Sequence, residues 1–120
     1  MGIARIAAAV FGVIYLAAGV AGFVTGTSPL FGLFPVNVSH NVVHIVLGAI
    51  LVYGMMSTSV AILATRLVGA ILLVLGVLGF FVPDGFGLVP LGGSDVWLHL
   101  GSAVVLLGVG FLTSEEPAMA

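Results

Sequence analysis

Three histidines and one aspartate are the residues of this sequence best suited to bind a metal ion or to carry a proton. His44 and His99 occupy the same place in two copies of an internal repeat. His40 and Asp95 each stand four residues earlier, on the same face of a helix as the histidine that follows. Three imidazoles and one carboxylate are a feasible ligand set for a zinc-type ion. Alternatively, His44 and His99 are the two axial ligands of a haem.

The repeat covers most of the chain and consists of two blocks in each copy. Residues 31–44 read FGLFPVNVSHNVVH, and residues 86–99 read FGLVPLGGSDVWLH. Besides the histidines, the shared positions include turn residues and a serine, namely Phe31, Gly32, Pro35 and Ser39 in the first copy and Phe86, Gly87, Pro90 and Ser94 in the second. The preceding blocks, 12–23 and 69–80, share a stripe of small residues, namely Gly12, Gly19 and Gly22 in the first and Gly69, Gly76 and Gly79 in the second.

The composition is that of a membrane protein. Of 120 residues, 62% are apolar and 5% are charged, whereas soluble domains carry about 25% charged residues. No Asp, Glu, Lys or Arg lies between Arg5 and Arg66. The net charge of −2 argues against nucleic acid as a partner, because phosphates require a basic surface. The absence of cysteine excludes disulfides and thiolate metal ligands.

Four apolar segments, at about 3–24, 38–56, 60–82 and 95–113, are long enough to cross a bilayer. Each has about 19–23 residues and covers about 28–35 Å as a helix, against a hydrocarbon core of about 30 Å. Helices are required because lipid offers backbone polar groups no other partner. We therefore expect an all-α membrane protein, with four transmembrane helices forming two parallel-repeat helical hairpins about a pseudo-two-fold axis along the membrane normal.

We expect one integral membrane domain over residues 1–120, divided into repeat 1 (about 3–56), repeat 2 (about 60–113) and a short cytoplasmic tail (114–120). Arg5 and Arg66 flank the first and third spans on one side, and no Lys or Arg lies on the other. The positive-inside rule then places both termini in the cytoplasm of a bacterial inner (plasma) membrane.

Local signals predict how the helices start and pack. Ser39 and Ser94 follow the repeated proline and suit N-caps of the second and fourth helices, and Ser57 or Ser59 suits the third. The glycine stripes let helix backbones approach closely in lipid. We expect them to pack the first span against the third, with a dimerisation face as the alternative.

The repeated histidines lie near the membrane interface and admit several interpretations. In the favoured one, each imidazole of His44 and His99 donates to a carbonyl of its own FGLxP loop and holds that loop over the helix end. In the second, His40, His44, His99 and Asp95 bind a metal ion across the bundle axis. In the third, His44 and His99 bind haem, although no Lys or Arg on that side would hold the propionates. Quinone, lipid or proton handling remains as a further group of alternatives.

The stretch FGLFPVNVSHNVVH, a glycine-rich helix and the terminal P…WLH resemble one family of bacterial four-span membrane proteins, grouped as domain of unknown function 4383. The resemblance covers nearly the whole chain. In such proteins the second copy usually carries a polar residue where this chain has Gly92, so a symmetric polar site at Asn37 and Gly92 is not expected. The resemblance implies an integral membrane location and no particular substrate, cofactor or catalytic residue.

From these features we expect a structural or accessory subunit of the bacterial inner membrane, forming a homo-oligomer or an assembly with other membrane proteins, and not an enzyme. No serine–histidine–acid spacing or phosphate-cradling glycine loop is present. No cofactor is expected under this hypothesis. Metal or haem binding is the first alternative, and a pore or transporter formed by oligomerisation is the second. Transport usually needs a charged residue deep in a span, and Asp84 and Asp95 lie at an edge.

Overall fold

Four long helices account for nearly all of the structure, a computed structural model that describes residues 2–25, 32 and 37–114. They are α1 (Ile3–Thr25), α2 (Val38–Tyr53), α3 (Thr58–Phe81) and α4 (Ser94–Leu112), with short 3-10 turns η1 (Gly54–Met56) and η2 (Gly85–Gly87). Each long helix, with η1 extending α2 to Met56, is long and apolar enough to span a membrane. The expected all-helical, four-span architecture is therefore confirmed.

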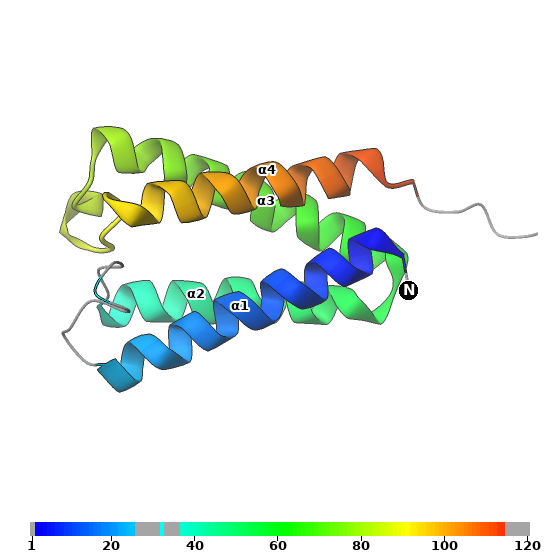
Figure 1. Ribbon diagram of the computed structural model, residues 1–120, viewed down its shortest axis with the longest axis horizontal. Helices are drawn as coiled ribbons and strands as arrows, with labels where there is room; N and C mark the ends of the chain where they lie inside the picture. The colour runs from blue at the N-terminus through cyan, green and yellow to red at the C-terminus, as the bar shows by residue number, and fades with distance from the viewer. Residues whose placement is uncertain (1, 26–31, 33–36, 115–120) are drawn as a thin grey trace, which may run out of the picture.

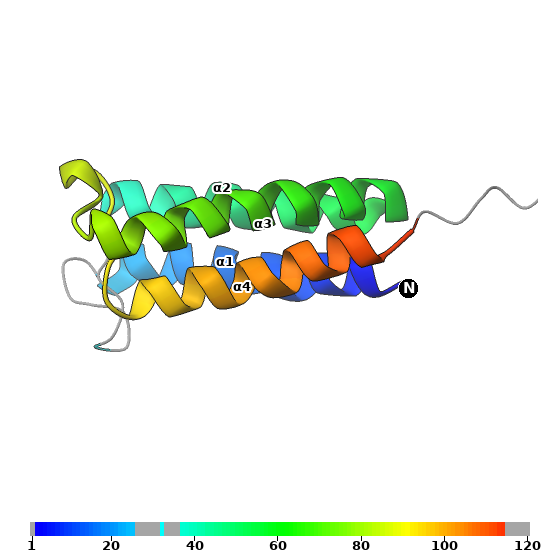
Figure 2. The same cartoon turned by 90° about the horizontal axis from the view of Figure 1, so that it is seen from above.

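Neighbouring helices run in opposite directions around the bundle. In Figure 1, α1 lies beside α2 and α3 beside α4, and in Figure 2, α2 and α3 form one layer while α1 and α4 form the other. Helices α2 and α4 therefore face each other diagonally and run in the same direction. We call the end with η2 and the starts of α2 and α4 the loop end, and the end with Ile3, η1 and Leu112 the terminal end.

The glycine stripes pack the two helices of each hairpin together. A Cβ atom added to Gly12 of α1 would lie 2.8 Å from Val52 Cγ2 of α2, and one added to Gly69 of α3 would lie 2.9 Å from Leu107 Cγ of α4. The other glycines have equivalent neighbours: Gly19 meets Ile45, Gly76 meets Leu100, Gly22 meets Asn41 and Gly79 meets Val96. For these six glycines both expectations are wrong, because each is buried against the other helix of its own hairpin. Ala8, the first small residue of the stripe in the first span, does pack against α3 as expected.

These contacts recur with a fixed sequence spacing. Each glycine of α3 comes the same number of residues after its counterpart in α1. Each residue contacted on α4 likewise comes a fixed, slightly smaller number of residues after its counterpart on α2. Two arginines make similar contacts at the terminal end, although they do not stand at the interval that separates the glycines. Arg5 Nε donates to Met55 O at 2.7 Å, and Arg66 Nε donates to Gly110 O at 2.8 Å. Each arginine thus binds a carbonyl near the C-terminal end of its partner helix, where a cation is favourable.

The interior of the terminal end is formed by small and aliphatic side chains. Ala4 and Ala8 of α1 pack against Ala61 and Ile62 of α3. Nearer the middle, aliphatic residues from α2, α3 and α4 surround Tyr15, namely Leu47, Leu51, Ala64, Val68, Leu72, Ala103 and Leu106. The alanines let α1 and α3 approach closely, because no long side chain separates their backbones.

The helix caps differ from those expected at two of three sites. Asn37, not Ser39, caps α2, since its Oδ1 accepts from the backbone N–H of His40 at 2.7 Å. Gly93, with φ 66° and no side-chain bond, precedes α4, so Ser94 is the first residue of that helix. Ser57 caps α3 as predicted, accepting from Val60 N at 3.2 Å. Asparagine reaches the free N–H groups from one residue before the helix, whereas Ser39 already lies within it.

The repeated loop motif forms a turn in both copies where it is described. Gly32 and Gly87 both adopt positive φ, 69° and 78°, a conformation that favours glycine. The remaining motif residues of the second loop, Phe86 and Pro90, lie in and after η2. Phe31 and Pro35 of the first loop lie outside the described residues. The predicted tail, 114–120, is described only at Ser114.

Candidate metal centre

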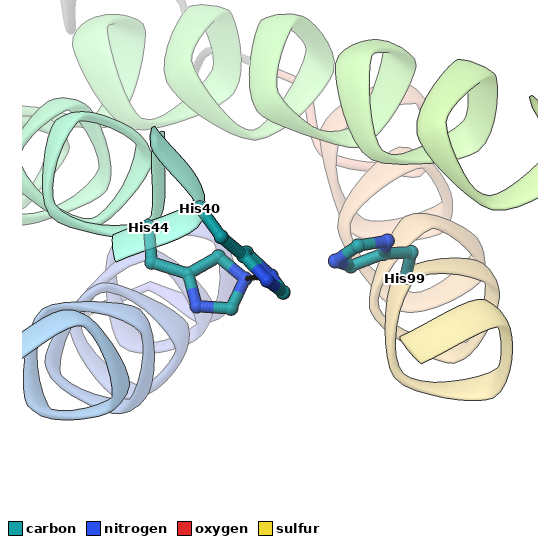
Figure 3. A group of neighbouring side chains, drawn as sticks. All are labelled: His40, His44 and His99. Carbon is teal, nitrogen blue, oxygen red and sulfur yellow. Dashed lines mark hydrogen bonds between the residues drawn. The ribbon is translucent and has the colours of Figure 1, made fainter. Parts of the chain in front are cut away.

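Three histidines meet inside the bundle near the loop end. His40 and His44 extend from α2 toward His99, which extends from α4 on the opposite side of the axis (Figure 3). One ring nitrogen from each histidine can be chosen so that the three nitrogens lie within 4.8 Å of one another. The side chains of His40, His44 and His99 are 1%, 4% and 1% exposed. The predicted set of histidines is therefore brought together in one buried cluster, although the sequence repeats only two of them.

The helices place these rings by simple geometry. His40 and His44 are one turn apart on α2, so both point to the same side, and their Nε2 atoms lie 3.0 Å apart. Because α2 and α4 are diagonal partners, the face of α4 that carries His99 looks across the axis at them. The ring centres of His44 and His99 are 5.9 Å apart.

Asp95, in the first turn of α4, lies beside the histidines but outside the group whose ligand atoms are within 4.8 Å of one another, so the predicted set of four ligands is brought together in its histidines only. Its Oδ2 lies 3.4 Å from His40 Nε2, and the side chain is fully buried. Neither carboxylate oxygen accepts a hydrogen bond within the described part of the chain. The N-terminal end of α4 contributes a favourable dipole. A buried neutral polar group without hydrogen bonds costs about 2–7 kcal/mol, and an ionised carboxylate costs more unless a positive charge compensates it.

His99 also has buried polar atoms that bind nothing in the described residues. Both its ring nitrogens are buried and without hydrogen-bond partners there. The interpretation in which this imidazole bonds to a carbonyl of its own loop is therefore wrong, since residues 82–93 are all described. For His44, whose Nε2 faces His40 instead, residues 33–36 of the corresponding loop lie outside the described residues.

A second pair of polar residues lies deeper in the bundle. Tyr15 of α1 donates its hydroxyl hydrogen to Ser102 Oγ of α4 at 2.9 Å, and both side chains are buried. The Tyr15 ring stands edge-on to His44, with ring centres 5.2 Å apart. We did not predict this pair. Ser102 comes one turn after His99 on the same face of α4. This spacing is the feature of the sequence that places the Ser102 side chain toward the bundle axis.

Asn37 connects the site to the opposite loop. While its Oδ1 caps α2 at His40, its Nδ2 donates to Leu88 O at 3.0 Å. Leu88 belongs to the FGLxP motif of the second repeat. One side chain thus fixes the start of α2 and ties it to the loop that precedes α4.

Three imidazole nitrogens with one carboxylate favour zinc or a neighbouring first-row transition metal over magnesium or calcium, which prefer oxygen ligands. Ligand nitrogens on a tetrahedral zinc ion are about 3.3 Å apart, given bonds of about 2.0 Å. The His40–His44 separation of 3.0 Å is close to that value, whereas the three nitrogens together are only within 4.8 Å of one another, so His99 would have to move inward to bind the same ion.

Haem fits the same residues less well. Its macrocycle would have to lie between His44 and His99, but the ring of His40 is centred only 4.3 Å from that of His44 and 6.2 Å from that of His99. A flat group as wide as a porphyrin would overlap His40. The arrangement therefore suits a single ion.

Comparison with known proteins gives a family match. Residues 5–112 match the family described as Domain of unknown function (DUF4383), in agreement with the resemblance of the FGLxPxNxxHNxxH motif. No curated protein and no solved structure matches significantly. The match spans all four helices and all four residues of the histidine–aspartate cluster.

Proposed function

We propose that this chain, which belongs to the DUF4383 family, is a membrane protein that binds a divalent first-row transition metal ion between its two hairpins. His40, His44 and His99 supply the nitrogen ligands. Asp95 supplies the balancing charge or a fourth ligand. The observation that carries the proposal is the convergence of three buried imidazoles from α2 and α4, with the buried carboxylate of Asp95 beside one of them.

The energetic cost of the cluster supports a bound cation. Polar groups inside a membrane are expensive and are retained where they have a function. Among the described residues, both carboxylate oxygens of Asp95 and both ring nitrogens of His99 are buried without a hydrogen-bond partner, as is Oδ1 of Asn41. A divalent ion would satisfy an imidazole nitrogen and a carboxylate oxygen together, and it would offset the negative charge.

We further propose that the hairpins are related by a two-fold axis along the membrane normal. The recurring glycine contacts of the two hairpins support this symmetry. Arg5 and Arg66 at the terminal end favour a cytoplasmic location for that end in a bacterial inner membrane. In this arrangement the metal would join the hairpins near the opposite surface.

An accessory or structural role is compatible with such a site, because an ion held by both hairpins stabilises the bundle that a partner recognises. The exposed helix faces are apolar and suit lipid or other membrane helices. Crosslinking in native membranes tests the predicted homo-oligomer or assembly. A chain that remains uncrosslinked to itself and to any other protein would contradict that role.

Metal stoichiometry tests the proposal. The full chain is purified in detergent without a histidine tag, loaded with Zn²⁺ or Mg²⁺, desalted, and analysed by mass spectrometry for metal content. We expect one zinc ion per chain and no retained magnesium. The double variant His44→Ala/His99→Ala should retain no zinc.

Leu51→Ala is the matched control, since Leu51 is fully buried in the aliphatic core and belongs to no polar contact. It destabilises the bundle and should still bind one zinc ion. Equal zinc retention by the double histidine variant and the wild type would overturn the proposal.

A further inference from the structure

A polar cavity lies at the terminal end, far from the histidines. It has a volume of about 370 Å³ and is lined by Ser59, Ile62 and Arg66 of α3 and by Phe111, Thr113 and Ser114 at the end of α4. One guanidinium and three hydroxyls thus surround a space that also has apolar walls. This combination suits an anionic oxygen-rich group carried on an apolar molecule.

The guanidinium of Arg66 is held in position at the cavity. Its Nε donates to Gly110 O at 2.8 Å, and its Cζ lies 4.5 Å from the centre of the Phe111 ring. These two contacts use one of the five N–H donors of arginine and leave the planar fork available. Among the described residues, no carboxylate lies within ion-pair distance of Arg66. Arginine in this state binds phosphate with paired, charge-assisted hydrogen bonds.

An apolar groove adjoins the cavity on the other side of α4. It has a volume of about 390 Å³ and runs between Ile3 of α1 and residues of α4 that include Val105, Val109 and Leu112. Thr113 lines both spaces. The groove follows α4 from the helix end toward the middle of the bundle, the direction that an acyl chain takes from the headgroup layer.

We propose that the Arg66 cavity binds the phosphate group of an anionic phospholipid, with an acyl chain in the adjoining groove. The cavity provides a cation for the phosphate and hydroxyls for a neutral polyol headgroup. A lipid such as phosphatidylglycerol is therefore favoured over phosphatidylcholine. This site is independent of the proposed metal centre.

Lipid binding to the purified, delipidated chain tests this proposal. Native mass spectrometry in detergent compares phosphatidylglycerol, phosphatidylcholine and inorganic phosphate as separate additions. We expect phosphatidylglycerol to bind at least about tenfold more tightly than phosphatidylcholine, since a charge-assisted fork is involved. Arg66→Gln should remove that preference.

Arg5→Gln is the matched control, because Arg5 lies at the same end and makes the equivalent carbonyl bond but does not line the cavity. We expect it to bind phosphatidylglycerol within about twofold of the wild type, because the fork of Arg66 is intact. If both arginine variants lost the same affinity for phosphatidylglycerol, the effect would come from the overall charge of the protein and not from this cavity. That result would overturn the proposal.

A second variant, Thr113→Val, keeps Arg66 and removes the hydroxyl shared by both spaces, so it serves if Arg66→Gln fails to fold. It should weaken phosphatidylglycerol binding by about threefold to tenfold, the loss of one hydrogen bond to the neutral polyol headgroup. Unchanged binding in Thr113→Val, or equal binding of the two lipids to the wild type, would overturn the proposal. Competition by millimolar inorganic phosphate would assign the cavity to a soluble anion and overturn its lipid character.

Discussion

The two ends of this bundle have opposite interiors although the same four helices form both. At the terminal end, Ala4, Ala8 and Ala61 are fully buried and bring α1 and α3 together. At the loop end, the axis is filled by imidazoles and a carboxylate from α2 and α4. Small residues stabilise helix contacts in lipid through close packing. We infer that packing at the terminal end offsets the cost of the polar atoms at the loop end.

A similar contrast separates contacts within the hairpins from the site between them. Glycines bring the helices of each hairpin into close contact. The histidine cluster, in contrast, joins α2 of one hairpin to α4 of the other across the diagonal (Figure 3). Any ion bound there would therefore stabilise the association of the hairpins rather than either hairpin alone.

In this comparison of the two ends, removal of the metal from the loop end should have the largest effect on the stability of the bundle. At free zinc about 1,000-fold above Kd, binding stabilises the native state by about 4 kcal/mol. A chelator should therefore lower the thermal midpoint of the wild type strongly and leave that of His44→Ala/His99→Ala unchanged. Thermal unfolding in detergent measures both. An equal response of the two proteins to chelator would contradict a site at these histidines.

Truncation of the aliphatic core gives the next largest effect. Leu51→Ala removes a fully buried side chain and should cost about 3 kcal/mol through the cavity that it leaves. The zinc stoichiometry should stay at one per chain because Leu51 contacts no predicted ligand. If this variant loses zinc while it remains folded, the two ends are coupled more closely than we propose.

Addition of a single methyl group to a glycine tests the close approach of the two helices within a hairpin. A Cβ on Gly76 would lie 2.6 Å from Leu100 Cδ2, whereas one on Gly101 would meet no atom within 4 Å. Gly76→Ala should therefore destabilise the bundle by about 2 kcal/mol through overpacking. Gly101→Ala, which only favours the helix, should be neutral or stabilising by up to about 1 kcal/mol. Similar unfolding free energies for the two variants would refute the role of the glycine stripe.

The helix caps provide the smallest and most selective comparison. Asn37→Ala and Ser57→Ala each remove one N-cap and should cost about 1 kcal/mol of unfolding free energy. Of the two, only Asn37 bonds to a residue of the proposed metal site, His40, and to the opposite loop. Zinc affinity should therefore fall about tenfold in Asn37→Ala, as for loss of a supporting contact, and stay constant in Ser57→Ala. Competition with a zinc-binding dye measures both affinities, and equal losses would argue against a positioning role for Asn37.

Hydrophobicity and the repeat predict the helices and the set of polar residues near the loop end. Bilayer thickness fixes the span lengths, and the i, i+4 spacing fixes which of His40, His44, Asp95 and His99 share a helix face. Whether α2 and α4 face each other depends on the order of helices around the bundle, which no spacing in one helix determines.

The predictions that were wrong or missing concern the contacts of the glycines, the cap of α2 and the Tyr15–Ser102 bond. They have the same origin. Helical spacing shows that Gly12, Gly19 and Gly22 share a face but does not show which helix that face contacts. Ser39 is a good capping residue, but Asn37, two residues earlier, forms the cap. The Tyr15–Ser102 bond joins residues 87 positions apart, so only the packing of α1 against α4 could reveal it.

X-ray absorption at the zinc edge of the loaded full chain tests the central claim most directly. The account predicts zinc–nitrogen distances of about 2.0 Å, with the multiple-scattering signature of three imidazoles, one further oxygen ligand and no sulfur. His99→Ala should lose one imidazole from that spectrum. A zinc ion surrounded only by oxygen, or an imidazole count unchanged in His99→Ala, would contradict a metal centre held by both hairpins.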